Sequence, residues 1–126
     1  MSFAEPTDGG RVVKEGVGAV KVTLIGTVQP GDPLYGASTG WARADASDDT
    51  KRCQLIAGNT GGVSGDEITA YVEAIIDFGS TCTATIPAHL YLSDTAGDYS
   101  ASAGTVEKVI GRMMTAQVAH VWGVHS

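Results

Sequence analysis

His89, His120 and His125 are the chain's only imidazole groups, and imidazole is the side chain best suited to general-base and metal-ligand chemistry near neutral pH. None of them belongs to a HEXXH sequence or a His-x-x-x-His pair on one helix face, the spacings that bind zinc. His120 stands in an alternating run beside Val121 and Trp122, where a structural or surface role is the favoured interpretation. We therefore expect no histidine-based metal centre.

Closely spaced carboxylates are a second candidate, because calcium prefers oxygen ligands. Asp45, Asp48 and Asp49 could supply them, but the EF-hand pattern is absent: counted from Asp45, the sixth residue is not glycine and the twelfth is isoleucine. A solvated loop is favoured, and a small metal-dependent hydrolase stays open as a third functional class. Asp94 and Asp98 bracket a turn, where aspartate commonly hydrogen-bonds its own backbone.

Nucleophilic and phosphate-binding motifs are incomplete. The glycine-rich stretch 58–65 has no lysine and so fails the phosphate-loop pattern, and the residues around Ser64 lack the second glycine of a nucleophile elbow. No spacing joins Ser64 to Asp66, or a cysteine to a histidine, in a nucleophilic set. Cys53 and Cys82 are too few for a disulfide scaffold and too far apart for a CxxC motif, so we expect buried free thiols. The sequence thus predicts a protein that is not an enzyme and that binds no metal or cofactor.

Composition restricts the fold and the partners. The 126 residues suit one domain, and the 17 glycines favour turns and closely approaching strands over long helices. The net charge of −6 disfavours nucleic-acid binding, and no apolar run is long enough to span a bilayer. The first residues lack the basic and apolar regions of a secretory signal, so we expect synthesis and folding in a reducing cytoplasm.

Hydrophobic alternation predicts strands in the first half of the chain. Val20, Val22 and Leu24 alternate with polar residues, and a period of two is typical of a half-buried strand. The elements expected after this strand are a turn at 29–33, short strands at 34–35 and 41–42, a polar loop at 45–51 and a strand at 53–57.

The segment from Glu67 to Phe78 fits two structures. Its apolar residues include a helical face, Ser64 and Glu67 could form a capping box, and Gly79 could end a helix. Every even-numbered position from 68 to 78 is also apolar, which is typical of a strand. Local pattern alone does not decide between them.

An internal repeat favours the strand. Leu34-Tyr35 recurs as Leu90-Tyr91, and each pair is followed by a turn, an isoleucine-containing segment and an alternating segment. We therefore predict an all-β fold: a compact β-sandwich or barrel-like domain spanning 16–126, built from two related β units at about 16–65 and 66–126 that share a central strand.

Residues 1–15 are predicted to form an extended N-terminal arm, because the first eleven contain two glycines, a proline and few apolar side chains. Phe3 could anchor this arm in the groove of a neighbouring subunit. The aromatic residues of the body could line a sugar-binding surface, although the matched places of Tyr35 and Tyr91 favour a core or subunit-contact role.

Two segments resemble a known family. Gly31-Asp32-Pro33-Leu34-Tyr35 and the run from Ile86 to Gly97, followed by Val109-Ile110-Gly111 and a closing alternating strand, resemble the decoration, or cement, proteins on the heads of tailed bacteriophages. The resemblance covers roughly residues 16 to 124. It departs from the family at Ala88-His89, where a glycine usually precedes the second Leu-Tyr, and in the acidic loop at 45–49.

The resemblance implies a non-enzymatic structural protein of the virion, made in the host cytoplasm and bound to the major capsid protein on the outer capsid surface. Such proteins commonly bind as homotrimers and stabilise the head against the pressure of its DNA. No nucleic-acid or membrane partner is expected. The alternative is a virion-borne module that binds glycans or host surfaces through exposed aromatic residues. The expected capsid or subunit contacts are Phe3, Pro6, Arg11, Trp41 and Trp122.

Overall fold

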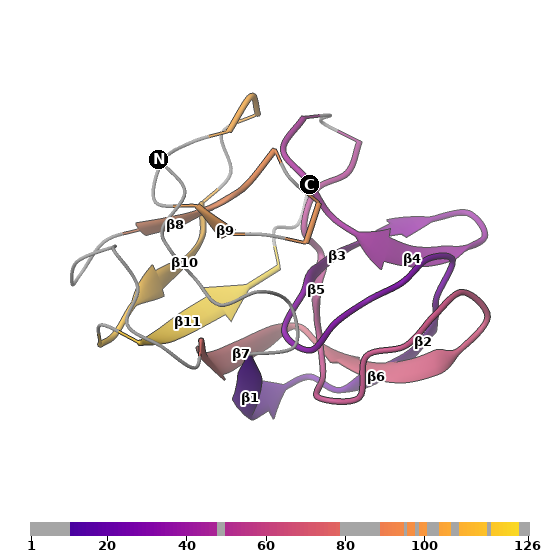
Figure 1. Ribbon diagram of the computed structural model, residues 1–126, viewed down its shortest axis with the longest axis horizontal. Coiled ribbons are helices and arrows are strands. Elements are labelled where there is room, and N and C mark those ends of the chain that lie inside the picture. Colours follow the sequence, from indigo (N-terminus) through magenta and orange to yellow (C-terminus); the bar gives the residue numbers. More distant parts are fainter. Residues whose placement is uncertain are drawn as a thin grey trace.

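The computed structural model describes residues 11–47, 50–78, 89–94, 96–97, 99–100, 104–106, 109–115 and 117–123 (Figure 1). Every regular element among them is a β-strand, which confirms the all-β prediction. The strands are β1 (Val12–Val17), β2 (Val20–Thr23), β3 (Pro33–Ala37), β4 (Gly40–Arg43), β5 (Leu55–Ala57), β6 (Glu67–Tyr71), β7 (Glu73–Asp77), β8 (His89–Leu92), β9 (Tyr99–Ser100), β10 (Val109–Met113) and β11 (Val118–Trp122).

The strands form two antiparallel sheets, which Figure 1 shows beside each other. The six-stranded sheet has the order β1-β7-β11-β10-β8-β9, and the five-stranded sheet has the order β2-β6-β5-β3-β4. The short strands at 34–35 and 41–42 are confirmed within β3 and β4. The strand expected at 53–57 begins only at Leu55, and Cys53 precedes it as a buried residue.

The strand orders confirm two related β units. Without β1, the order β7-β11-β10-β8-β9 repeats β2-β6-β5-β3-β4 with every strand replaced by the one five places later in the chain. The repeated Leu-Tyr pairs lie in the equivalent strands β3 and β8. The boundary expected at residue 65 is wrong, because β6 belongs to the first sheet and the change of sheet comes at Val72.

The segment from Glu67 to Phe78 is extended, as predicted, but forms two strands in different sheets. β6 pairs with β2, and β7 pairs with β1, so these four strands make one antiparallel ribbon that passes from one sheet to the other. The ribbon turns at Gly18 and Val72, where Val72 N donates to Val17 O at 2.9 Å. Gly18 has a φ of 72°, and a Cβ there would lie 2.7 Å from a Val72 methyl, so the corner requires glycine.

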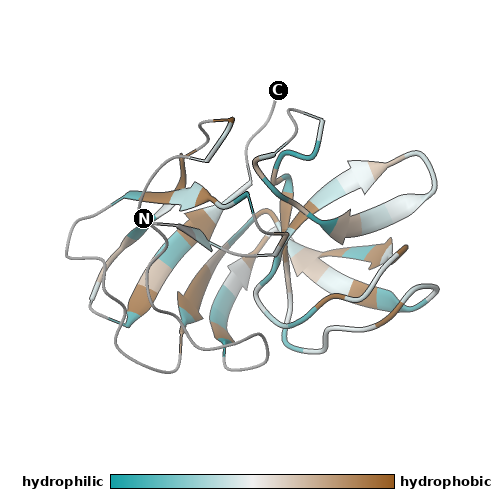
Figure 2. Cartoon of the chain, turned by 45° about the horizontal axis from the view of Figure 1, so that its top comes forward, coloured by the Kyte–Doolittle hydropathy of each residue, from teal (hydrophilic) through white to brown (hydrophobic). Residues whose placement is uncertain are grey.

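Two hydrophobic cores lie along this ribbon, and apolar and polar residues alternate along its strands (Figure 2). Because residues of both sheets meet in the larger core, it joins the two β units. The larger core consists of Val13, Ala44, Ala46, Cys53, Ile56, Ala74, Ile76, Phe78, Leu90, Leu92, Tyr99, Ile110, Met113, Ala119 and Val121. The smaller core consists of Val22, Leu24, Val28, Leu34, Leu55, Ala57, Ile68 and Ala70.

The five-stranded sheet curls toward a barrel around the smaller core. Its two edge strands approach each other where Leu24 forms a parallel bridge with Trp41, and Ile25 N donates to Trp41 O at 2.9 Å. The partly buried Trp41 packs against this core.

The predicted C-terminal boundary of the arm, residue 15, is wrong. Val12–Val17 is strand β1 at one edge of the six-stranded sheet, paired with β7, because Val13 inserts into the larger core and β7 supplies backbone partners. Residues 1–10 lie outside the described part of the chain.

Candidate functional site

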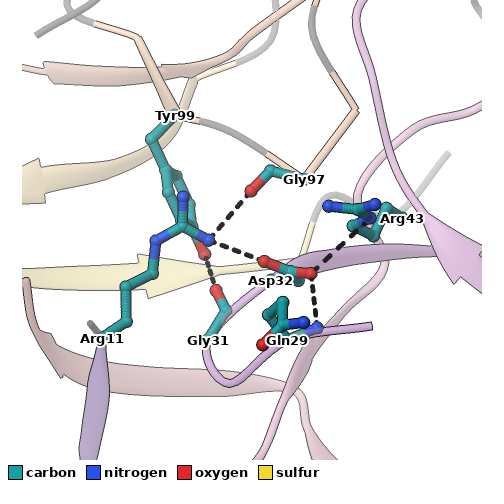
Figure 3. A network of polar contacts seen from close by, with 7 residues as sticks. All are labelled: Arg11, Gln29, Gly31, Asp32, Arg43, Gly97 and Tyr99. Atoms are coloured by element: carbon teal, nitrogen blue, oxygen red, sulfur yellow. Dashed lines mark hydrogen bonds and ion pairs between the residues drawn. The ribbon is translucent and has the colours of Figure 1, made fainter. Parts of the chain in front are cut away.

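A buried ion pair lies where the start of the chain meets both β units (Figure 3). Arg11 Nη1 is 2.7 Å from Asp32 Oδ1, and both side chains are fully buried. The same Nη1 donates to the carbonyl oxygen of Gly97 at 2.9 Å. Asp32 Oδ2 accepts a hydrogen bond from Gln29 N at 2.8 Å and lies 3.8 Å from Arg43 Nε. The pair thus ties three distant segments together.

Aromatic rings complete the surroundings of Arg11. Its guanidinium carbon lies 5.1 Å from the ring centroid of Tyr99 and 6.0 Å from that of Phe78, within the range of cation–π attraction. The two rings meet edge to face at 5.7 Å, and Tyr99 donates its hydroxyl proton to Gly31 O at 2.7 Å. With no solvent access to Arg11, this network suits a structural anchor and not a reaction centre.

The expected role of Arg11 as a capsid or subunit contact is therefore wrong in the structure of this chain. The Arg11 guanidinium is buried and does not reach the surface. Its burial is possible because Asp32 supplies the opposite charge, and an unpaired buried charge would be strongly unfavourable. The companion residues Phe3 and Pro6 lie outside the described residues.

The two tryptophans occupy different environments. Trp41 is partly buried against the smaller core, and its ring also lies close to Gly36. Trp122 is partly exposed on β11, where its ring meets His120 edge to face at 5.1 Å between centroids. Of the two, Trp122 is the better placed for contact with a partner or a glycan, because its loss would not open the smaller core.

The outer face of the six-stranded sheet carries a small surface pocket of about 180 Å³. It is lined by Glu15, Gly16, Val17, Glu73, Ala74, Ile75 and His120, from strands β1, β7 and β11. His120 Nε2 lies 3.3 Å from Glu73 Oε1, and both side chains are partly exposed.

Register brings the polar residues of this face together. Ile75 of β7 stands between Glu15 of β1 and His120 of β11, and His120 is followed across the sheet by Arg112 and His89. Sequence reasoning missed this row because its members come from five separate strands. The alternation around His120 showed which face it occupies, and only strand pairing shows its neighbours.

Strand β1 is an edge of the same sheet, and no other strand of the described residues pairs with its free side. Asn59 covers it at one point: its side-chain amide accepts from Val13 N at 2.8 Å and donates to Val13 O at 2.9 Å. Beyond this cap, Val17 is 58% exposed, and Val12 at the start of the strand is 46% exposed. A long edge strand with exposed valines is a site at which another extended chain can add.

The described part of the acidic loop departs from the expected solvated loop at Asp45, which is only 8% exposed and lies between the buried Ala44 and Ala46, whereas Ser47 is exposed. Asp45 Oδ1 accepts hydrogen bonds from the backbone and hydroxyl of Ser47, and Lys51 Nζ lies 4.0 Å from Asp45 Oδ2. Asp48 and Asp49 lie outside the described residues. In the part of the chain that the structure describes, no group of three or more histidine, cysteine or acidic side chains could hold a metal ion.

Cys53 is a fully buried free thiol, which agrees with the prediction for this residue. Burial raises the pKa of the Cys53 thiol to about 12, although a backbone hydrogen bond from Leu34 opposes the shift. A thiol held neutral in this way is a poor nucleophile. Cys82 and His125 lie outside the described residues.

The other polar candidates have local roles. Asp66 Oδ2 accepts from Val63 N at 2.9 Å, and Asp94 accepts from the backbone and hydroxyl of Thr105. Tyr35 packs against the larger core, as the matched position of the repeat suggests. Asp98 lies outside the described residues.

The described residues contain no helix that is long and apolar enough to cross a membrane. Comparisons of the chain with protein-family models, curated proteins and solved structures gave no match.

Proposed function

We propose that this protein is a non-enzymatic decoration, or cement, protein of a tailed-bacteriophage capsid, which binds the major capsid protein on the outer shell and stabilises the head. The proposal begins from the two sequence segments that resemble this family. It extends to a homotrimer on the virion surface. The structure adds support in three steps: the position of those segments, the anchoring of the chain's start, and the open surface beside it.

The observation that carries the proposal is the meeting of the two family-like segments at one point. Gly31-Asp32 comes from the first segment and Gly97 from the second, and Arg11 Nη1 contacts Asp32 Oδ1 and Gly97 O together (Figure 3). The two segments therefore maintain the fold and hold Arg11 in place. A fixed attachment point such as Arg11 suits a protein that transmits force between its own body and a capsid shell.

The binding surface in this proposal includes strand β1. It begins one residue after the Arg11 anchor, forms an open sheet edge and presents Val12 and Val17 to solvent. Burying these valines against a partner would be favourable, and backbone groups of an open edge can pair with an extended segment. If three subunits bind as a unit, their contacts are released together, which raises the overall affinity.

Co-sedimentation with mature capsids that lack their decoration protein tests the proposal. The full chain is expected to pellet with the capsids and to saturate. Val17→Lys is expected to weaken binding, whereas Val63→Lys, at a comparably exposed position (56%) in the glycine-rich connection, leaves it unchanged. A chain that stays in the supernatant, both intact and without residues 1–10, contradicts the proposal.

A glycan- or host-surface-binding module is the second candidate, favoured by the partly exposed Trp122 beside His120 and the surface pocket. Glycan-array binding that Trp122→Ala abolishes would support it. Trp41→Ala is the less informative variant, because Trp41 packs against the smaller core.

A further inference from the structure

We infer that the pocket on the outer face of the six-stranded sheet is a binding site for a single lysine side chain of a protein partner. The pocket is bounded by β1, β7 and β11, and it lies beside the open edge of the sheet. This inference does not rest on the capsid proposal, because a lysine on any protein surface has the required chemistry.

The size of the pocket limits its occupant. Sites for metabolites and other drug-sized ligands usually enclose about 300–1,000 Å³. The volume here is about 180 Å³, which suits one side chain rather than a free small molecule. The open mouth of the pocket lets a side chain enter while its backbone stays on the surface.

The walls have an amphipathic chemistry. Val17, Ala74 and Ile75 provide aliphatic surface, and Glu15 and Glu73 provide carboxylates. Lysine matches this combination, because its alkyl stem packs on apolar walls while its compact ammonium donates to acidic oxygens. Arginine carries a broad planar guanidinium that is harder to accommodate in this volume.

The charges around the pocket favour a cation. Among the described residues, the Glu15 carboxylate makes no hydrogen bond or ion pair, and the Glu73 carboxylate has one polar side-chain partner, His120 Nε2 at 3.3 Å. Arg112, the cation of the row, lies beyond His120 on the side away from β1, and the exposed Lys14 adjoins Glu15 at the bulge of β1. The net charge of −6 attracts basic partners over a longer range.

The probe is an acetylated and amidated peptide of sequence Thr-Val-Lys-Val-Thr, titrated into the ¹⁵N-labelled full chain and followed by amide chemical shifts. The amides of Glu15, Glu73 and His120 are expected to shift together. A peptide with norleucine in place of lysine keeps the alkyl stem but lacks the ammonium, and it is expected to bind at least about fivefold more weakly. Higher ionic strength is expected to weaken only the lysine peptide.

Charge-removing variants locate the site. Glu15→Gln and Glu73→Gln are each expected to weaken the lysine peptide about three- to fivefold. Glu67→Gln removes the same charge from an exposed position on β6 in the other sheet and is expected to leave binding unchanged.

Three results would overturn the inference: equal binding of the norleucine peptide, shifts confined to residues outside the pocket, or an equal effect of Glu67→Gln. The norleucine comparison uses the unaltered protein, so it holds even if a variant folds poorly. If the pocket amides shift when the protein alone is diluted, a second copy of the chain is the occupant, and the inference of a separate partner fails.

Discussion

Replacing Asp32 by Asn should destabilise the protein strongly, because it leaves the Arg11 guanidinium buried without its carboxylate. Arg11 Nη1 lies 2.7 Å from Asp32 Oδ1, and neither side chain reaches solvent. After the substitution Arg11 keeps the Gly97 carbonyl and the Tyr99 ring but loses the charge of the Asp32 carboxylate. Removing one partner of a buried ion pair usually costs about 3–5 kcal/mol, a large part of the about 5–15 kcal/mol that stabilises a typical domain.

The reverse substitution, Arg11→Met, keeps most of the aliphatic stem and should cost less, about 2–3 kcal/mol. The reason is that Asp32 keeps a hydrogen bond from Gln29 N at 2.8 Å and the Arg43 Nε at 3.8 Å. The double variant removes both buried charges, so its loss should be smaller than the sum of the single losses by about 2 kcal/mol.

Urea unfolding followed by circular dichroism measures these free energies. With a slope of about 2 kcal/mol per molar urea, Asp32→Asn should lower the midpoint by about 2 M. Lys51→Met is the matched control, because the Lys51–Asp45 pair is 4.0 Å apart and partly exposed, and its loss should cost less than about 1 kcal/mol. Single losses below 1 kcal/mol at Arg11 and Asp32, or additive effects in the double variant, would refute the anchor.

Three further predictions concern the corner, the thiol and the tryptophans. Gly18→Ala should lower the free energy of unfolding by about 2–3 kcal/mol, and Gly65→Ala by about 1 kcal/mol. Both glycines have positive φ, but only at Gly18 would the added Cβ meet a neighbouring atom, the Val72 methyl. Equal losses of stability in urea unfolding would contradict this prediction. In a Cys82→Ser background, Cys53 should react with a thiol reagent only on unfolding. Folding raises the pKa of Cys53 from 9.0 to about 12, so the unfolded chain ionises first as the pH rises. The contribution of this thiol to the free energy of unfolding is therefore present below pH 9 and lost between pH 9 and 12, and Cys53→Ala should not show this loss. Trp41→Ala should destabilise the fold by about 2–4 kcal/mol and Trp122→Ala by about 1 kcal/mol, and the reverse order in thermal unfolding would show that their environments are misassigned.

Sequence reasoning predicted the β architecture because strand alternation and duplication leave a direct trace. The repeated Leu-Tyr pairs mark equivalent strands, β3 and β8, and the two sheets share one strand order. The break at Val72 left no such trace. Even-numbered residues point into a core on both sides of the corner, first Ile68 and Ala70 in the smaller core and then Ala74 and Ile76 in the larger one, so the pattern reads as one strand.

The candidate sites were harder to predict for a different reason. Arg11 stands in a polar, glycine-containing region that is typical of an exposed arm, and its partner Asp32 is separated from it by two strands of sequence. A buried ion pair depends on tertiary packing, which local composition does not encode. The pocket residues Glu15 and His120 are likewise brought together only by the register of β1, β7 and β11.

The most direct test of the proposed function is the temperature at which DNA becomes sensitive to nuclease in capsids with and without the bound protein. A protein that braces the shell should raise this temperature as it saturates the capsid surface. The Asp32→Asn variant, heated beyond its own unfolding transition, should leave the temperature at that of bare capsids. An unchanged temperature at saturating amounts of the intact protein would contradict a stabilising role on the capsid.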